Sequence, residues 1–329
     1  MAEGSSKTVV YAALAGNFAI AIVKFGASWW SGSSAMLTEA IHSLVDTGNQ
    51  GLLLFGMNRA GREPDESHPF GHGMELYFWS FVVALMIFLA GGAFSIYEGV
   101  QKFLHPEPIS DAWVALVVLG ISAVFEGASF WVALREFNAR RREIPLLRAI
   151  RLSKDPSGFS VLLEDSAALA GLAVAAIGVA ATTYLGVPQG DAVASVVIGL
   201  LLVAAAIVLA RETRSLLTGE SASPRVLGTV RRVLEADPRV KDVHALQSIQ
   251  LGPTKVLFAI ALDIDDSLEL DGFKALGAEL RDRIKREAPI VSNVFFKLGA
   301  PEYEADAERG LRTDQIYSDE PAEAAAGAA

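Results

Sequence analysis

Two long uncharged stretches constrain the fold of this chain more than any other feature of its sequence. Residues 77–97, YFWSFVVALMIFLAGGAFSIY, and residues 192–210, AVASVVIGLLLVAAAIVLA, contain no charged side chain. A helix of about 20 apolar residues crosses a hydrocarbon core of about 30 Å. Both stretches are therefore predicted to cross a membrane as helices.

Four further segments have a similar length and contain only one to three ionisable residues each: residues 9–30, 34–58, 112–134 and 160–184. The fold class predicted is an α-helical membrane protein, with six transmembrane helices in a transport domain at residues 8–214. Membrane lipid is thus an expected partner, and nucleic acid is not.

Basic residues predict the orientation of the six segments, because short cytoplasmic loops are enriched in Lys and Arg. The connections SGS, HPEPISD and GVPQGD contain neither residue type. The alternate connections and the stretch after the sixth segment carry Arg59, Arg62, Arg135, Arg140, Arg141, Arg142, Arg148, Arg151, Lys154, Arg211 and Arg214. Both termini are therefore predicted to lie on the cytoplasmic side of a cytoplasmic (inner) membrane, with no cleaved signal before the first segment.

A change of composition at TGESASP marks a second, soluble region. Residues 222–300 are predicted to form a cytoplasmic α+β domain of ferredoxin-like order α-β-β-α-β, with DVHALQSIQLG and KVLFAIALDID as its first two strands. An open sheet of this kind has free edges that can pair with a second copy. The acidic, Ala-rich residues 301–329 are predicted to be disordered.

The second predicted span, which includes AMLTEAIHSLVDTGNQ, is unusually polar for its position. At about 100° per residue, Glu39, His42, Asp46 and Asn49 fall on one stripe of a helix. His42 and Asp46 are four residues apart, so their side chains can converge on one ion. Ionisable groups at membrane depth indicate a transport or proton-relay site, and the alternative is an interhelical hydrogen-bond stripe.

The fifth predicted span contains VLLEDSAALAGLAV, with Glu164 and Asp165 well inside it. Adjacent helical residues point about 100° apart, so one carboxylate would bind an ion and the other would lie nearby. An imidazole with carboxylates suits Zn²⁺ or a similar borderline divalent ion, and the chain has no Cys. Lys24 and Glu126, in the first and fourth spans, are expected to pair within the bundle, to reach its edge or to relay protons.

GSSAMLTEAIHSLVDTGNQ, followed by PDESHPFGHG, resembles the cation diffusion facilitator family over roughly residues 8–300. The resemblance implies a six-span divalent-metal/proton antiporter with a cytoplasmic α+β domain, working as a homodimer. LLEDSAAL in the fifth span is similar to the zinc-transporter branch that includes the mitochondrial zinc exporter.

Carried over residue by residue, the resemblance implies that His42, Asp46 and Asp165 are ligands of the transported metal. Val161 stands where the family usually has a His or Asp. Glu164 is the substitute ligand predicted here, with water or Asn49 as alternatives. Glu39, one turn before His42, is expected to orient it.

A second metal site is implied in the connection between the second and third spans. Asp65, His68 and His72 match the family's cytoplasmic-side site, and their spacing independently suits a metal. The alternative is a polar loop that caps a helix. In the C-terminal domain only His244 remains of the histidines that other members use, so metal regulation there is not expected.

The function predicted is therefore export of a divalent metal, Zn²⁺ in the first place, against protons by alternating access. The sequence contains no nucleotide-binding loop and no HExxH motif, so neither ATP hydrolysis nor enzyme activity is expected, and no cofactor besides the transported metal. The alternative is a metal-binding scaffold or sensor derived from a transporter, which Val161 motivates.

Overall fold

The computed structural model describes residues 2–106, 111–141 and 145–299 of the chain, which divides into two compact units between Thr218 and Gly219. The predicted disordered tail at 301–329 lies outside the described residues.

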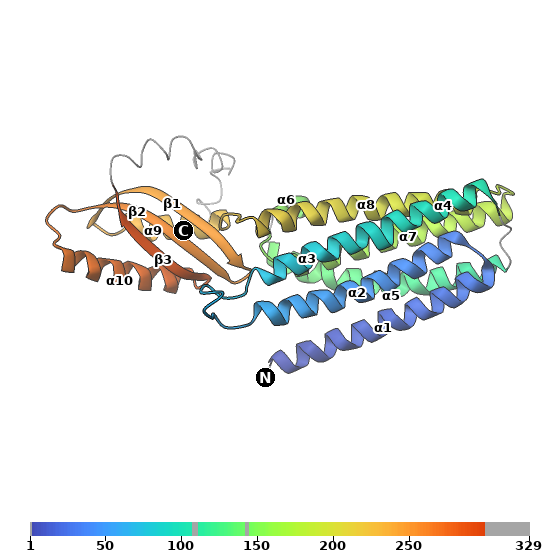
Figure 1. Ribbon diagram of the computed structural model, residues 1–329, viewed down its shortest axis with the longest axis horizontal. Helices are drawn as coiled ribbons and strands as arrows, with labels where there is room; N and C mark the ends of the chain where they lie inside the picture. Colours follow the sequence, from blue (N-terminus) through green and yellow to red (C-terminus); the bar gives the residue numbers. More distant parts are fainter. Residues whose placement is uncertain (1, 107–110, 142–144, 300–329) are drawn as a thin grey trace, which may run out of the picture. The chain divides into compact units, whose positions relative to one another are not determined.

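Long helices make up the first unit, and all six predicted segments lie within them (Figure 1). Their bounds are α1 Ala2–Ser31, α2 Ser34–Ala60, α3 Glu75–Met86, η1 Ile87–Ala93, α4 Phe94–Leu104, α5 Ala112–Arg141, α6 Leu146–Leu152, α7 Pro156–Tyr184 and α8 Gly190–Leu217. Within the described part of the chain, four helices are long and apolar enough to cross a membrane: Glu75–Leu104, Ala112–Ala139, Pro156–Tyr184 and Gly190–Leu217. The helix with the polar stripe, α2, is not among them.

The helix from Glu75 to Leu104 contains a feature that its sequence did not indicate. Its middle, η1, is π-helical, a geometry that widens the turn and often marks a functional position. A Cβ added to Gly92 would lie 3.2 Å from the carbonyl oxygen of Gly199 in α8, and one added to Gly199 would lie 2.8 Å from that of Gly92. Glycine at both positions therefore permits the close approach of η1 and α8.

A buried carboxylate joins the start of α8 to the start of α2. Asp191 accepts hydrogen bonds from the Ser33 hydroxyl at 2.5 Å, the Ser34 amide at 2.6 Å and the Ser34 hydroxyl at 2.8 Å. Ser33 is itself the N-cap of α2 and accepts from the Met36 amide at 3.1 Å. A carboxylate beside a helix N-terminus satisfies free N–H groups and complements the helix dipole.

The second unit has the predicted order of elements, with α9 Pro224–Glu235, β1 Val240–Gly252, β2 Lys255–Ile264, α10 Leu270–Glu287 and β3 Val291–Leu298 (Figure 1). The sheet order is β1-β2-β3, with β1 antiparallel and β3 parallel to β2. Alternate residues of β2, namely Val256, Phe258, Ile260 and Leu262, are buried in one apolar core with residues of both helices.

Replacing Asp191 with Ala should destabilise the first unit more than removing an ordinary helix cap. The change leaves buried donors of Ser33 and Ser34 without their acceptor, which should lower the free energy of unfolding by about 3 kcal/mol. Thermal unfolding of the detergent-solubilised protein, followed by circular dichroism, measures the loss.

The matched control is Asp155→Ala. Asp155 caps α7 through Ser157 within the same helix and is only half-buried, so its loss should cost about 1 kcal/mol. Equal losses for the two variants would show that the link between α8 and α2 adds nothing to ordinary capping.

Candidate metal sites

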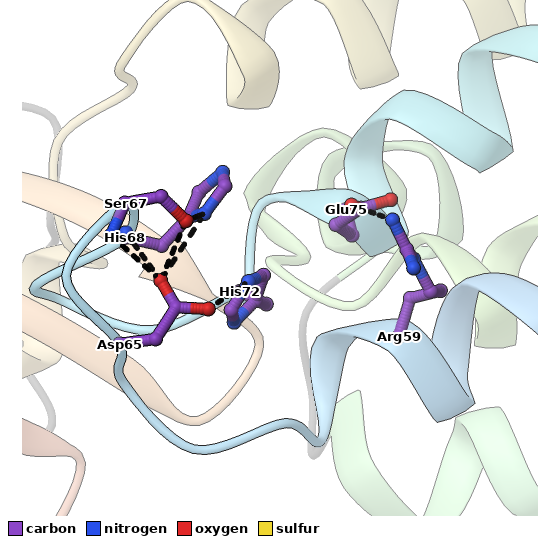
Figure 2. A network of polar contacts seen from close by, with 6 residues as sticks. All are labelled: Arg59, Asp65, Ser67, His68, His72 and Glu75. Carbon is purple, nitrogen blue, oxygen red and sulfur yellow. Dashed lines mark hydrogen bonds and ion pairs between the residues drawn. The ribbon is translucent and has the colours of Figure 1, made fainter.

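The connection between α2 and α3 gathers three potential metal ligands, Asp65, His68 and His72 (Figure 2). One ligand atom of each lies within 4.8 Å of the others. The His68 Nδ1 is 3.6 Å from Asp65 Oδ1, and the His72 Nε2 is 3.4 Å from Asp65 Oδ2. In the described residues, no other group of three or more His, Asp or Glu is drawn together this closely.

Local backbone geometry holds Asp65 in place. Its Oδ1 accepts hydrogen bonds from the Ser67 amide at 2.9 Å, the Ser67 hydroxyl at 2.7 Å and the His68 amide at 2.7 Å. Such bonds from an Asp to the residues that follow are typical of an Asx turn. They favour the ionised carboxylate and lower the pKa of Asp65 to about 2, with the Ser67 hydroxyl as the largest cause.

The second histidine returns to Asp65 through a tight turn. Gly71 has a φ of 89°, which glycine adopts without strain, and its amide donates to the carbonyl oxygen of His68 at 2.9 Å. The rings of His68 and His72 lie with their centroids 4.3 Å apart. His72 is only 6% exposed, whereas His68 and Asp65 are about half exposed, so the cluster opens on one side.

An ion pair closes the base of this connection. Arg59 at the end of α2 pairs with Glu75 at the start of α3 at 3.3 Å (Figure 2). The Trp79 indole donates to the other oxygen of Glu75 at 3.0 Å. The pair holds together the two helix ends from which the connection starts and returns.

Inside the helices, the predicted stripe of α2 is buried. The His42 Nε2 lies 3.5 Å from Asp46 Oδ2, as the four-residue spacing predicts. Both ring nitrogens of His42, the Oδ1 of Asp46 and the side-chain amide of Asn49 are buried and have no hydrogen-bond partner in the described part of the protein. Buried polar atoms are normally paired, so this set calls for an additional ligand.

The carboxylates of α7 face the same interior. Glu164 and Asp165 are both buried, and Glu164 Oε1 has no hydrogen-bond partner among the described residues. Asp165 Oδ2 accepts from the Ser129 hydroxyl of α5 at 2.8 Å. Asp46 is near enough for its charge to interact with those of Glu164 and Asp165. These three carboxylates and His42 are not, however, drawn together as tightly as the loop cluster.

The other predicted residues occupy distinct places. Lys24 pairs inside the bundle with Glu39 at 3.3 Å and with Glu126 at 4.0 Å. Of the alternatives for Lys24 and Glu126, pairing within the bundle is therefore confirmed. Glu39 is thus held by Lys24, at one helical turn from His42. Val161 lies one turn before Asp165 on α7 and offers no ligand atom.

Some residues at these sites were not found from the sequence. Ser67 could have been found, because Asp-x-Ser is a common turn signal. Ser129 donates a hydrogen bond to Asp165, and Ser43 accepts one from Lys24. Both serines lie on helices, where a serine by itself indicates no such partner. Only the packing of different helices reveals their partners.

Comparison with known proteins matches residues 10–218 to the cation efflux transmembrane domain. The chain is 38% identical over 260 residues to the proton-coupled zinc antiporter SLC30A9, mitochondrial, of Homo sapiens, covering 78% of this chain and 46% of that protein. It is 33% identical over 286 residues to metal tolerance protein C4 of Arabidopsis thaliana, covering 86% of this chain and 63% of that protein.

A more distant relative is the cation-efflux pump FieF of Klebsiella pneumoniae, at 25% identity over 272 residues, with 82% of this chain and 85% of that protein covered. The chain spans about half the length of the human relative. The transmembrane match covers well over half of the chain. The family expected from the sequence is thereby confirmed: the chain belongs to the cation efflux, or cation diffusion facilitator, family of membrane transporters and not to a family of enzymes.

Proposed function

We propose that this chain exports a divalent metal cation, Zn²⁺ in the first place, from the cytoplasm in exchange for protons. The observation that carries the proposal is the buried His42–Asp46 pair of α2 inside a cation efflux domain. Both ring nitrogens of His42 and the Oδ1 of Asp46 have no hydrogen-bond partner in the described residues. Relatives described as a proton-coupled zinc antiporter and as a cation-efflux pump support the metal and the direction.

The transported ion would be bound by His42, Asp46 and Asp165. Glu164 would be the fourth ligand, because Val161 stands where the family usually has a His or Asp. One imidazole with carboxylate oxygens suits Zn²⁺ better than Mg²⁺ or Ca²⁺, which prefer oxygen ligands alone. The carboxylates of α2 and α7 are near enough for their charges to interact, but the ligand atoms do not form a tight cluster. Such an arrangement is expected of a site that tightens around its ion.

Proton coupling follows from the chemistry of these ligands. A metal binds only to neutral imidazole and ionised carboxylates, so protons and metal compete for the same atoms. Imidazole ordinarily titrates near pH 6.5. If the site opens alternately to the two sides of the membrane, an inward proton gradient drives metal outward.

The proposed topology has six spans, with α1 and α2 crossing alongside the four apolar helices. The polar stripe of α2 faces protein and not lipid, because Glu39, His42 and Asp46 are buried within the unit. The basic connections support an orientation with both termini on the cytoplasmic side of the cytoplasmic membrane.

A homodimer is also proposed, through the second unit. Its β1 and β3 are edge strands, and Phe295 and Leu298 of β3 are exposed. Edge strands with exposed apolar side chains favour pairing with another chain.

His42→Ala and Asp165→Asn should each lower Zn²⁺ flux into proteoliposomes under an imposed pH gradient by about 100-fold, because even groups that only orient metal ligands cost about 10–100-fold. Flux is followed with a Zn²⁺-sensitive dye inside the vesicles, with the gradient oriented for exchange.

Thr47→Ala is the matched control on the same helix. Among the described residues, the Thr47 hydroxyl donates to the carbonyl oxygen of Ser43 and to no other acceptor, so its loss should change flux less than twofold. Wild-type protein that binds Zn²⁺, Co²⁺, Fe²⁺ and Mn²⁺ without moving any of them would contradict export and favour the scaffold or sensor alternative.

The loop cluster should bind Zn²⁺ in a pH-dependent way that Asp65 does not set. With its pKa near 2, Asp65 stays ionised throughout the working range, and its stabilising hydrogen bonds are lost only as pH falls through about 2. Because imidazole binds a metal only in its neutral form, Zn²⁺ affinity should instead fall as the pH is lowered from about 8 to about 5.5. Calorimetric titration of a His42→Ala background between pH 5.5 and about 8 measures this.

In that background, Asp65→Asn should weaken binding about tenfold or more, and Zn²⁺ affinity should still fall as the pH is lowered. His72→Ala should abolish the binding. A Zn²⁺ affinity that no longer depends on pH in Asp65→Asn would instead make the carboxylate the titrating group.

A further inference from the structure

The first unit holds a lysine whose ammonium is entirely buried. Lys24 in α1 is 0% exposed, and Glu39 in α2 is as fully buried. A buried charge is tolerated only when it is paired and hydrogen-bonded, and lysine is among the residues least often found fully buried. The long side chain does not extend to an edge of the bundle, so its position within the interior needs a reason.

Oxygen atoms from two other helices surround the ammonium. The Lys24 Nζ donates to the Ser43 hydroxyl at 2.7 Å and to Glu39 Oε2 at 3.3 Å, and it lies 4.0 Å from Glu126 Oε1 in α5. Glu39 and Ser43 are four residues apart on one face of α2. Two of the three ammonium donors thus have an acceptor on α2, and Glu126 adds a negative charge at ion-pair distance.

One carboxylate oxygen beside the Lys24 ammonium is not used in these contacts. Glu39 Oε1 is buried without a hydrogen-bond partner in the described residues, and it points at Gly171 of α7, where an added Cβ would lie 2.5 Å from it. Glycine at 171 thus leaves the room that this carboxylate takes. Two carboxylates and a hydroxyl, with no imidazole among them, form the kind of ligand set that hard divalent cations such as Mg²⁺ and Mn²⁺ prefer.

We propose that Lys24 is a tethered cation that occupies an oxygen-donor pocket formed by Glu39, Ser43 and Glu126, and that it thereby keeps free divalent cations out. The ammonium supplies one fixed positive charge where a free ion would bring two. Lys24 is in this sense a specificity-determining residue. With the ammonium in place, a metal can bind to the set that contains His42 but not to the oxygen-only set around Lys24.

The position of the pocket explains why its occupancy matters. Glu39 and Ser43 lie three residues before and one residue after His42 on α2. A free divalent ion there would place its charge within about one helical turn of the transport ligands and repel the transported ion. The tethered ammonium also ties this turn of α2 to α1, since its partners lie on both sides of His42.

The test is Mn²⁺ binding to the full chain in detergent, followed by electron paramagnetic resonance. Asp65→Ala, His68→Ala and His72→Ala are introduced throughout to remove the loop cluster. Lys24→Ala in this background should bind about one more Mn²⁺ per chain than the same background with Lys24. Adding Glu39→Gln and Glu126→Gln to Lys24→Ala is the matched control and should abolish the additional binding.

Loss of the lysine leaves two buried carboxylates unpaired and can prevent folding without metal. Lys24→Ala is therefore also purified with Mn²⁺ present, and its thermal midpoint is measured with and without the ion. A midpoint that rises more with Mn²⁺ in Lys24→Ala than in the variant that also carries Glu39→Gln and Glu126→Gln supports the proposal. A folded Lys24→Ala that binds no additional ion, or one that stays unfolded in Mn²⁺, overturns it.

These measurements need no transport, so they are separate from the test of Zn²⁺ export. Additional Mn²⁺ binding in Lys24→Ala would stand even if the wild-type chain carried no flux. Conversely, gradient-driven Zn²⁺ flux in the wild type would stand if Lys24→Ala bound no additional ion.

Discussion

The cost of burying charge in an apolar helix bundle is the constraint on which the first unit depends. An ionised group taken out of water costs several kcal/mol unless a partner is supplied. The bundle supplies such partners across helices: Lys24 of α1 for Glu39 of α2, Ser129 of α5 for Asp165 of α7, and the N-terminus of α2 for Asp191 of α8. The polar residues thus hold the helices in place as well as offering ligand atoms.

Against this background, the atoms left without a partner become informative. The nitrogens of His42 and one oxygen each of Asp46 and Glu164 are buried and have no hydrogen-bond partner in the described residues. An isolated defect of this kind would be costly for stability. A set of them on facing helices is understandable when an ion or protons complete the hydrogen bonding for part of the transport cycle.

The two candidate metal sites differ in how far they are assembled. The loop cluster is drawn together by contacts between residues close in sequence, an Asx turn at Asp65 and a glycine turn at Gly71. The membrane set comes from α2 and α7, more than 100 residues apart, and its spacing depends on how two whole helices pack. The first can therefore be preorganised for metal, whereas the second can change with helix movement, which alternating access requires.

Sequence alone predicted the long helices, the order of the C-terminal elements and the candidate ligand residues, because these follow from hydropathy, from spacing along one helix and from family motifs. His42 and Asp46 were predictable since a four-residue separation places them together whatever surrounds them. Only the tertiary structure decided that Lys24 lies among Glu39, Ser43 and Glu126, that Ser129 holds Asp165 and that Asp191 caps α2. Those contacts join residues from 15 to 158 positions apart, and their partners depend on which helix faces which, a property of packing that no local pattern encodes.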